Sequence, residues 1–152
     1  MKEIEIKING EWRKVVVKPN ETLLTVLREK LGIKSPKCGC ERGDCGACAV
    51  LLNGRSVRSC LVLAIETAGQ EIVTVEGISQ NGLSKVQNLM IDKNAFQCGF
   101  CAPGMIISAT ELLEKNSHPT LDEIKEALAG NLCRCTGYLP ILDAVKEAAE
   151  DR

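Results

Sequence analysis

The segment Cys38-Gly-Cys-Glu-Arg-Gly-Asp-Cys-Gly-Ala-Cys48 places four of the nine cysteines of the chain within eleven residues. Thiols this close in sequence converge on one point only if the backbone curls into a tight loop. Gly39, Gly43 and Gly46 suit such a loop, because glycine tolerates positive φ angles and close backbone approach. We therefore predict a curled loop that aims its amide N–H groups at the sulfurs, with the first half of the chain built around it.

The spacing Cys40-x4-Cys45-x2-Cys48-x11-Cys60 is that of plant-type ferredoxins, in which four thiolates hold a [2Fe–2S] cluster. A four-cysteine zinc site fits less well, because zinc ligands usually occur as two short-spaced pairs. Disulfides are disfavoured in the reducing cytosol. Cys38 is surplus, since it replaces Cys40 only if the spacing opens to six residues, and we interpret it as a partly buried spectator thiol.

The composition is that of a folded chain with one or two small domains. The 152 residues include 19 basic and 20 acidic side chains, so the formal net charge is −1, and 45% of the residues are hydrophobic. Such a chain is a poor partner for nucleic acid or an anionic membrane. No apolar run approaches the roughly 18 residues that span a bilayer, and residues 1–10 do not resemble a signal peptide. The sequence therefore predicts a cytoplasmic protein.

The first half of the chain has the pattern of a small mixed sheet with one crossing helix. Isoleucines alternate with charged residues before Asn9-Gly10, which is a strong hairpin signal, and Asn53-Gly54 marks another hairpin. Leucines at helical spacing predict a helix over residues 22–31. The predicted strands cover residues 4–8, 12–17, 49–52, 55–57 and 72–75.

The second half, from residue 83, has helical periodicity, which predicts four short helices packed as a bundle. Thr120-Leu-Asp-Glu123 is a capping box that opens the third helix, and Gly130 ends it. Pro140 suits the first turn of the fourth helix. The predicted domains are residues 1–77 and 82–152, joined by a linker at residues 77–82.

Four more cysteines form a second group in the helical half. Cys98-x2-Cys101 precedes a predicted helix over residues 103–115, and Cys133-x-Cys135 follows after 31 intervening residues. Helix N-termini carry partial positive charge and free N–H groups, which stabilise thiolates and anionic clusters. The spacing of this group is equally compatible with zinc and with an iron–sulfur cluster.

Three of the four aromatic residues, Phe96, Phe100 and Tyr138, lie within three residues of these cysteines. They either exclude water from a redox centre or fill the core of the bundle. We interpret Arg134 as a solvated side chain and His118, the only histidine, as a loop residue without a catalytic role.

Three motifs of the chain occur together in one known family. Residues 38–50 read Cys-Gly-Cys-Glu-Arg-Gly-Asp-Cys-Gly-Ala-Cys-Ala-Val, residues 97–105 read Gln-Cys-Gly-Phe-Cys-Ala-Pro-Gly-Met, and residues 130–138 read Gly-Asn-Leu-Cys-Arg-Cys-Thr-Gly-Tyr. With these motifs, essentially the whole chain resembles the small iron–sulfur subunit of the molybdenum hydroxylases. This family includes xanthine dehydrogenase, aldehyde oxidoreductase, aerobic-type carbon monoxide dehydrogenase and nicotinate dehydrogenase.

The resemblance implies an α+β fold, in which an N-terminal β-grasp domain of the plant-type ferredoxin kind precedes a C-terminal four-helix-bundle domain. Each domain would hold one [2Fe–2S] cluster, so the resemblance favours iron and sulfide over zinc for the second group. The implied ligands are Cys40, Cys45, Cys48 and Cys60 for the first cluster, and Cys98, Cys101, Cys133 and Cys135 for the second. Ala49 and Ala102 stand where the family often has threonine, and Cys38 is additional, but no ligand is missing.

The resemblance also implies partner subunits and a direction for electrons. Gln97 and Cys135 would contact molybdopterin, expected as a dinucleotide, in a large partner subunit. The first cluster would pass electrons toward FAD in a medium-sized partner subunit. The expected assembly is a heterotrimer or a dimer of heterotrimers.

Clusters saturated by cysteine exchange electrons but bind no substrate. The sequence has no paired acid and base and no Gly-rich dinucleotide loop, so we expect no catalytic residue in it. We therefore predict the electron-transfer subunit of a molybdenum-dependent oxidoreductase that acts on a small substrate. A stand-alone two-cluster ferredoxin and a zinc-stabilised interaction module are the alternatives, and the substrate and final acceptor stay open.

Overall fold

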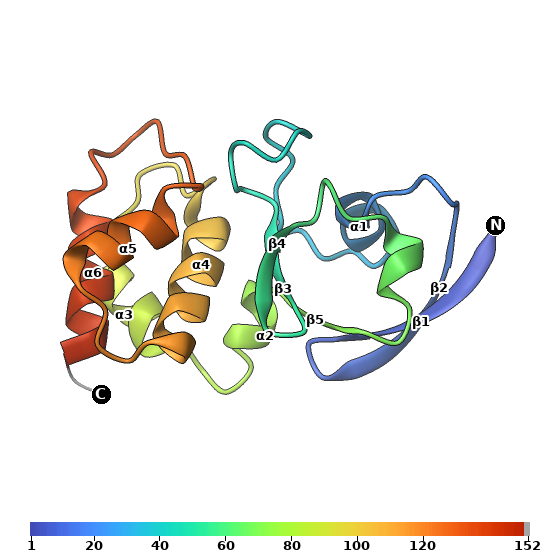
Figure 1. Ribbon diagram of the computed structural model, residues 1–152, viewed down its shortest axis with the longest axis horizontal. Helices are drawn as coiled ribbons and strands as arrows, with labels where there is room; N and C mark the ends of the chain where they lie inside the picture. The colour runs from blue at the N-terminus through green and yellow to red at the C-terminus, as the bar shows by residue number, and fades with distance from the viewer. Residues whose placement is uncertain (151–152) are drawn as a thin grey trace.

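The computed structural model describes residues 1–150, in which a mixed β-sheet and a group of helices lie side by side (Figure 1). The strands are β1 (Lys2–Ile8), β2 (Glu11–Val17), β3 (Ala49–Leu52), β4 (Arg55–Arg58) and β5 (Glu71–Val73). They are ordered β2-β1-β5-β3-β4, with β1 and β5 parallel and the other neighbouring pairs antiparallel. The predicted α+β class and mixed sheet are confirmed.

Two Asn-Gly turns close the hairpins β1–β2 and β3–β4, as predicted. Asn9 and Gly10 have φ angles of 49° and 87°, and Asn53 and Gly54 have φ angles of 49° and 79°. Two-residue hairpin turns of the favoured type need positive φ at both positions, which asparagine and glycine tolerate best.

The predicted helix over residues 22–31 is only partly α-helical. It begins as α1 (Leu23–Thr25) and continues as a π-helical turn, η1 (Val26–Lys30). The Leu31 N–H reaches back five residues to the Val26 carbonyl at 3.1 Å, which makes the last turn wider than in an α-helix. The predicted helix is therefore present, but its second part departs from α-helical geometry in a segment where Val26 is fully buried in the sheet core.

The strand predicted at residues 72–75 lies instead at Glu71–Val73. Thr74 leaves the sheet because its N–H donates to Oδ1 of Asn9 at 2.9 Å, while Nδ2 of Asn9 donates to its hydroxyl at 3.0 Å. Helix α2 (Val75–Ile78) begins directly afterwards, so the strand excludes the last two predicted residues.

The remaining helical elements are η2 (Ala64–Thr67), a 3-10 turn, and α3 (Lys85–Asp92), α4 (Ala102–Lys115), α5 (Leu121–Leu128) and α6 (Leu139–Glu150). The predicted capping box of Thr120 and Glu123 opens α5, and Ser84 with Gln87 forms another at α3. Pro140 lies in the first turn of α6, as predicted. Within residues 1–150, no helix combines the length and apolar character needed to cross a membrane.

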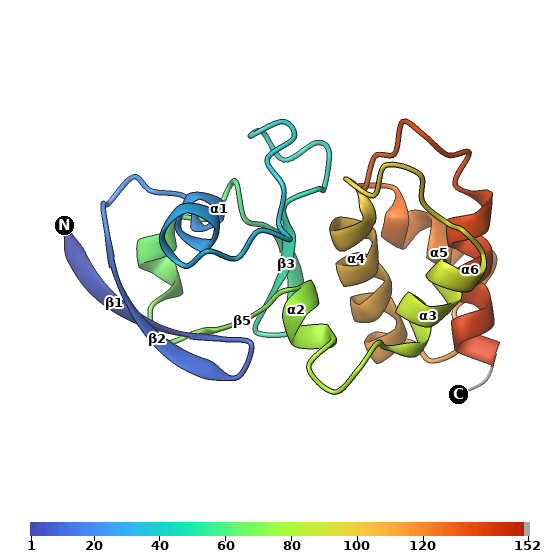
Figure 2. The same cartoon turned by 180° about the vertical axis from the view of Figure 1, so that it is seen from behind.

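Two hydrophobic cores meet at β3. Val50 is buried in the core of the sheet half, whereas Ala49 and Leu51 pack with Ile107 of α4 on the opposite face. Both faces of this strand are covered, which explains its continuous apolar sequence. The loops that carry the two cysteine groups lie at the same end of the molecule, at the top of Figure 1 and of the reverse view in Figure 2.

Candidate metal centres

The first cysteine group surrounds one small cavity. The cavity is lined by Leu24, Lys37, Gly39, Cys40, Glu41, Cys45, Cys48 and Cys60. The curled loop before β3 supplies three of these thiols, and Cys60 comes from the turn after β4. Cys48 and Cys60 are buried, and Cys38 does not line the cavity. The prediction that Cys38 is partly buried is wrong, because its place at the start of the curled loop leaves it exposed.

Backbone amides of the loop point at sulfur, as its predicted curl requires. The N–H groups of Arg42, Cys45 and Asp44 hydrogen-bond the Cys40 thiol, and the first two are the main reason that its pKa is lowered to about 6. The Cys45 nitrogen lies 3.4 Å from the Cys40 sulfur. These donors stabilise the thiolate, which is the form that binds a metal.

Burial acts against ionisation at the deeper thiols. Loss of solvation is the main reason that the pKa of Cys60 rises to about 11, although the Gly43 N–H hydrogen-bonds this thiol. Loss of solvation also raises the pKa of Cys45. A metal cation offsets this penalty, because it replaces the thiol protons and compensates the thiolate charge.

Gly39 leaves room for the sulfur of Cys45. A Cβ atom at position 39 would lie 2.8 Å from this sulfur and 3.5 Å from Cε1 of Phe100. The absence of a side chain at this position therefore lets the loop close around its own thiols, as predicted from the glycine pattern.

The second group consists of an exposed pair and a deeper pair of thiols. The sulfurs of Cys98 and Cys135 lie 3.5 Å apart, and both residues are exposed. Burial, followed by a hydrogen bond with the Cys133 thiol, raises the pKa of Cys101 to about 12. Burial acts in the same direction on Cys133, but hydrogen bonds from the hydroxyl and N–H of Thr136 outweigh it and lower its pKa.

The thiols of each group are arranged in pairs, which bears on the kind of metal centre that fits. The pairs are Cys40 with Cys45, Cys48 with Cys60, Cys98 with Cys135, and Cys101 with Cys133. Zinc gathers four sulfurs around one ion, whereas each iron of a two-iron cluster takes two cysteines. The contacts between neighbouring thiols are therefore compatible with a two-iron cluster in each group.

Gln97 lies at the exposed side of the second group. It is itself exposed and directly precedes Cys98, whose sulfur contacts that of Cys135. The two residues expected to contact a cofactor thus lie on the same exposed side of this group, whereas Cys101 is buried.

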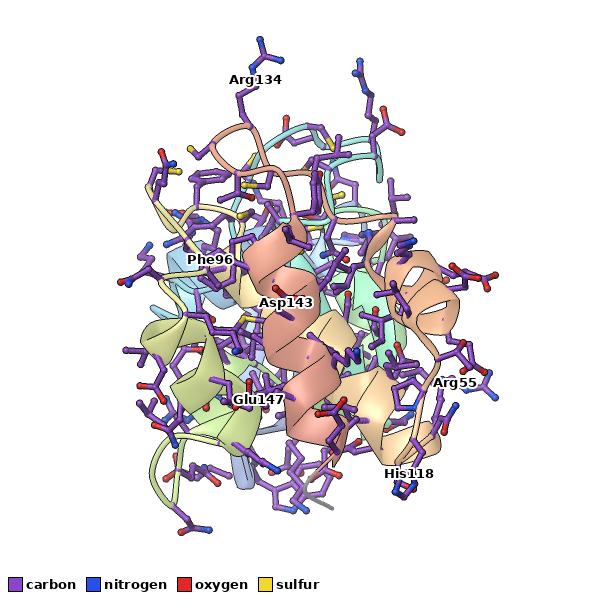
Figure 3. The ribbon with its side chains drawn as sticks, turned by 90° about the vertical axis from the view of Figure 1, so that its left-hand side faces the viewer. Arg55, Phe96, His118, Arg134, Asp143 and Glu147 are labelled. Atoms are coloured by element: carbon purple, nitrogen blue, oxygen red, sulfur yellow. The ribbon has the colours of Figure 1, made fainter. Side chains whose placement is uncertain are left out.

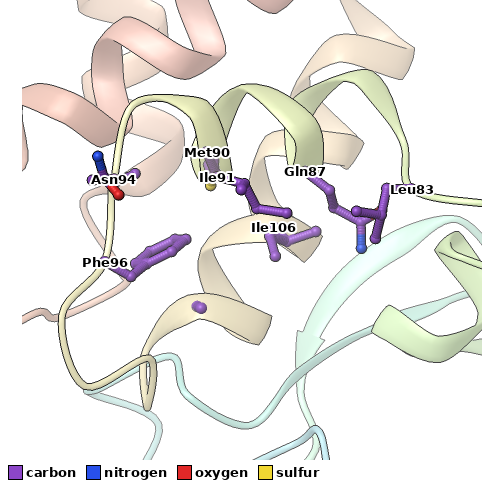
Figure 4. Close-up of a pocket in the computed structure, with 9 residues that line it drawn as sticks. Leu83, Gln87, Met90, Ile91, Asn94, Phe96 and Ile106 are labelled. Atoms are coloured by element: carbon purple, nitrogen blue, oxygen red, sulfur yellow. The ribbon is translucent and has the colours of Figure 1, made fainter.

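An apolar groove of about 380 Å³ opens between α3 and α4 (Figure 4). Its walls include Leu83, Ile91, Phe96 and Ile106. Leu83 and Ile91 expose 50% and 61% of their surfaces, which is high for large apolar side chains. Phe96 in the wall of the groove directly precedes the exposed Gln97 in the chain, so this part of the wall lies near the exposed side of the second cysteine group.

Known proteins match both halves of the chain. A family described as "2Fe-2S iron-sulfur cluster binding domain" matches residues 6–74, and one described as "[2Fe-2S] binding domain" matches residues 74–146. The nicotinate dehydrogenase small FeS subunit of Eubacterium barkeri is 47% identical over 97% of this chain and 94% of its own length. The nicotine 6-hydroxylase small subunit of Paenarthrobacter nicotinovorans is 50% identical over 96% of this chain and 88% of its own length.

A solved structure agrees with these matches. In the crystal structure of quinoline 2-oxidoreductase from Pseudomonas putida 86, one chain is 44% identical and superposes with a TM-score of 0.94. The match covers 98% of this chain and 94% of that chain. The chain is a small iron–sulfur subunit of the molybdenum hydroxylase family.

The iron–sulfur subunit therefore has a [2Fe–2S]-binding domain in each half. The spacing of the second cysteine group left zinc and iron–sulfur open, and the match of this half to a [2Fe–2S]-binding domain decides for iron–sulfur. Family membership also identifies the chain as part of an oxidoreductase complex. The assignment of individual cysteines as ligands stays a prediction that the paired geometry supports.

The aromatic residues near the second group differ in their surroundings. Phe96 and Tyr138 are half-buried and pack against the helical core. Phe100 is 46% exposed, and its ring approaches Gly39 in the loop of the first group. Core filling therefore explains two of the three aromatics, while Phe100 lies between the two cysteine loops.

Arg134, between Cys133 and Cys135, is solvated as predicted, and His118 lies in a loop as predicted. Arg134 is exposed and extends into solvent at the top of Figure 3. His118 lies at the opposite end of the iron–sulfur subunit, where its ring contacts the Ser117 hydroxyl and its N–H donates to Asn116.

The residues that join the two cysteine loops are not evident from the sequence. Nη2 of Arg58 donates to the Gly130 carbonyl at 2.8 Å, and the Leu132 N–H donates to the Cys45 carbonyl at 2.9 Å. Asn131, between these two contacts, is 1% exposed. The motif Gly-Asn-Leu-Cys-Arg-Cys-Thr-Gly-Tyr contains three of these residues, but nothing in it indicates which segment they meet.

Proposed function

We propose that this iron–sulfur subunit carries single electrons from a molybdopterin centre in a large partner subunit to FAD or another acceptor. The [2Fe–2S] clusters supply the one-electron chemistry when bound. The observation that carries the proposal is the pair of four-thiol groups at one end of the molecule, whose loops are joined by the 2.9 Å hydrogen bond from Leu132 to Cys45.

The proposed ligands are Cys40, Cys45, Cys48 and Cys60 for one cluster, and Cys98, Cys101, Cys133 and Cys135 for the other. All eight are cysteines, so neither cluster has an open position for substrate, and the reaction itself takes place in the partner. We assign residues 1–77 to a β-grasp domain, in agreement with the strand order β2-β1-β5-β3-β4, and residues 82–152 to a four-helix domain. Gln97 and Cys135 are the proposed contacts to the pterin.

The proposed assembly contains the iron–sulfur subunit, a large molybdopterin-binding subunit and a medium FAD-binding subunit, as a heterotrimer or a dimer of heterotrimers. Diffusing electron carriers usually have a strongly charged surface that steers brief encounters. This chain has a net charge of −1, which favours a permanent subunit of the assembly over a diffusing carrier. No disulfide joins any of the cysteines within residues 1–150, which agrees with the proposed reducing, cytoplasmic location.

We assign the apolar groove between α3 and α4 to the interface with the large subunit. Phe96 in the wall of the groove is the chain neighbour of Gln97, which would meet a pterin held by that subunit. A partner that approaches Gln97 closely also covers the neighbouring groove, and the exposed Leu83 and Ile91 provide apolar surface for this contact.

Replacing Ile91 with glutamate is expected to weaken binding of the large subunit at least about tenfold, because a charge would be buried in an apolar contact. Affinity purification of the tagged iron–sulfur subunit, followed by titration with the large subunit, measures this loss. Leu121→Glu is the matched control, since Leu121 is 46% exposed at the first turn of α5, where a negative charge is tolerated. Equal affinities for both variants would remove the groove from the interface.

The function is tested by isolating the native complex through a tag on this chain and assaying iron, sulfide, zinc, molybdenum and FAD. We expect about four irons and four sulfides per chain, together with molybdenum, FAD and two larger subunits. The same irons on a lone chain would identify a free electron carrier instead. Zinc without sulfide would overturn the redox function.

A further inference from the structure

Three consecutive residues of the second cysteine loop are hydrogen-bonded to the sheet half. The Gly130 carbonyl accepts from Arg58 at 2.8 Å, Nδ2 of Asn131 donates to the Gly46 carbonyl at 3.4 Å, and the Leu132 N–H donates to the Cys45 carbonyl at 2.9 Å. Gly46 and Cys45 belong to the first cysteine loop. The two loops are therefore in direct contact along a short, continuous stretch of chain.

Asn131 is the one side chain of this stretch that is bonded on two sides. Its Oδ1 accepts from the Ser108 hydroxyl in α4 at 2.8 Å, and its Nδ2 is directed at the Gly46 carbonyl. Its main-chain carbonyl accepts from the Tyr138 hydroxyl at 3.2 Å, and that hydroxyl accepts from the Cys133 N–H at 2.8 Å. One buried amide thus connects a helix, the first loop and the second loop.

Two glycines give this amide its space. A Cβ atom at Gly46 would lie 2.8 Å from Nδ2 of Asn131, and one at Gly104 would lie 3.0 Å from the same atom. The backbones of α4 and the first loop also approach closely here, since a Cβ at Gly104 would meet the Gly46 carbonyl oxygen. The site is therefore built tightly around the Asn131 side chain.

We propose that Asn131 is the positioning residue that holds the two cysteine groups at one fixed separation. The inference rests on the proposed function, because the separation matters only if electrons pass between the two groups. Without the amide, the Gly46 carbonyl keeps only the Ala49 N–H at 3.1 Å as a donor, and the Ser108 hydroxyl loses its acceptor in a buried site, where water or a shift of the loop must replace it. The Leu132–Cys45 hydrogen bond, directly beside Asn131, then loses its support.

Three variants separate the contacts of Asn131. Asn131→Asp keeps the acceptor for Ser108 but loses the donor to Gly46, Asn131→Ala loses both, and Ser108→Ala loses only the bond to α4. Thr67→Ala is the control, because Thr67 is equally buried and donates to a backbone carbonyl, Ala64, within the sheet half alone.

The first measurement is the magnetic interaction between the two reduced clusters in electron paramagnetic resonance spectra of the purified complex. In Asn131→Asp and Asn131→Ala, we expect the splitting of the signals to become smaller and the signals themselves to become broader. We expect a smaller change in Ser108→Ala and none in Thr67→Ala. A merely destabilising substitution would not alter this interaction in molecules that retain both clusters. Unchanged splitting in both Asn131 variants would overturn the inference.

The second measurement is amide hydrogen exchange at Leu132, which needs no spectroscopic signal from the clusters. Loss of one supporting hydrogen bond is expected to speed exchange about fivefold in the Asn131 variants, but not in Thr67→Ala. An unchanged exchange rate would also count against the proposal. A wild-type protein without iron would instead contradict the proposed function, so the two failures are distinguishable.

Discussion

Replacing Cys60 with alanine is expected to halve the iron bound by the subunit, from about four to about two irons per chain. Cys60 is 7% exposed and lines the cavity formed by the first cysteine group, so alanine would leave that cluster with three thiolates in a buried site. The second group lies in the helical half, with its own core, and should keep its cluster. Iron and sulfide analysis with visible absorption spectra measures the loss.

The retained second cluster is an internal check that the variant has folded. Cys38→Ala is the matched control, because Cys38 comes from the same loop but is exposed and does not line the cavity. This control should bind as much iron as the wild type. Loss of iron from Cys38→Ala, with no loss from Cys40→Ala, would move the ligand assignment from Cys40 to Cys38. Full iron in Cys60→Ala would contradict the ligand set.

Replacing Gly46 with alanine is expected to lower the apparent melting temperature of the anaerobic protein by about 10 °C. Gly46 has φ 73°, where a non-glycine residue costs about 1–2 kcal/mol. Its new Cβ would also meet the Gly130 carbonyl oxygen and lie 2.8 Å from Nδ2 of Asn131. Overpacking of this kind adds about 1–3 kcal/mol, and backbone atoms cannot move aside as a flexible side chain can.

Gly69→Ala is a closely matched control for this substitution. Gly69 has φ 74°, but a Cβ atom there would meet nothing within 4 Å. It therefore carries the backbone strain without the collision, and a decrease of about 4 °C is expected. Equal decreases for the two variants would show that the second loop accommodates the added Cβ at no cost, which would contradict tight packing against Gly46.

Local sequence signals predicted most of the secondary structure. The Asn-Gly pairs at residues 9–10 and 53–54 specify hairpin turns because few other residues tolerate two successive positive φ angles. The capping box at Thr120 and Glu123 marks the start of α5 because the two side chains satisfy free N–H groups of the first turn. Each of these signals acts within a few residues, so no tertiary information is needed.

The structure departs from the predicted elements in two places, and in both places residues contact distant parts of the chain. The helix predicted at residues 22–31 widens into a π-turn against the sheet core. The strand predicted at residues 72–75 ends early because Asn9, more than sixty residues away, hydrogen-bonds Thr74. No periodicity in either segment contains that information.

The sequence by itself predicted which cysteines belong together, because closely spaced thiols on a glycine-rich loop converge when the backbone curls. Only the tertiary structure decided how the thiols pair and how the two groups meet. The contact of Gly130, Asn131 and Leu132 with the loop of Cys45 and Gly46 joins segments some 85 residues apart. Such a contact depends on the packing of β3 against α4, which leaves no periodic trace in the sequence of either loop.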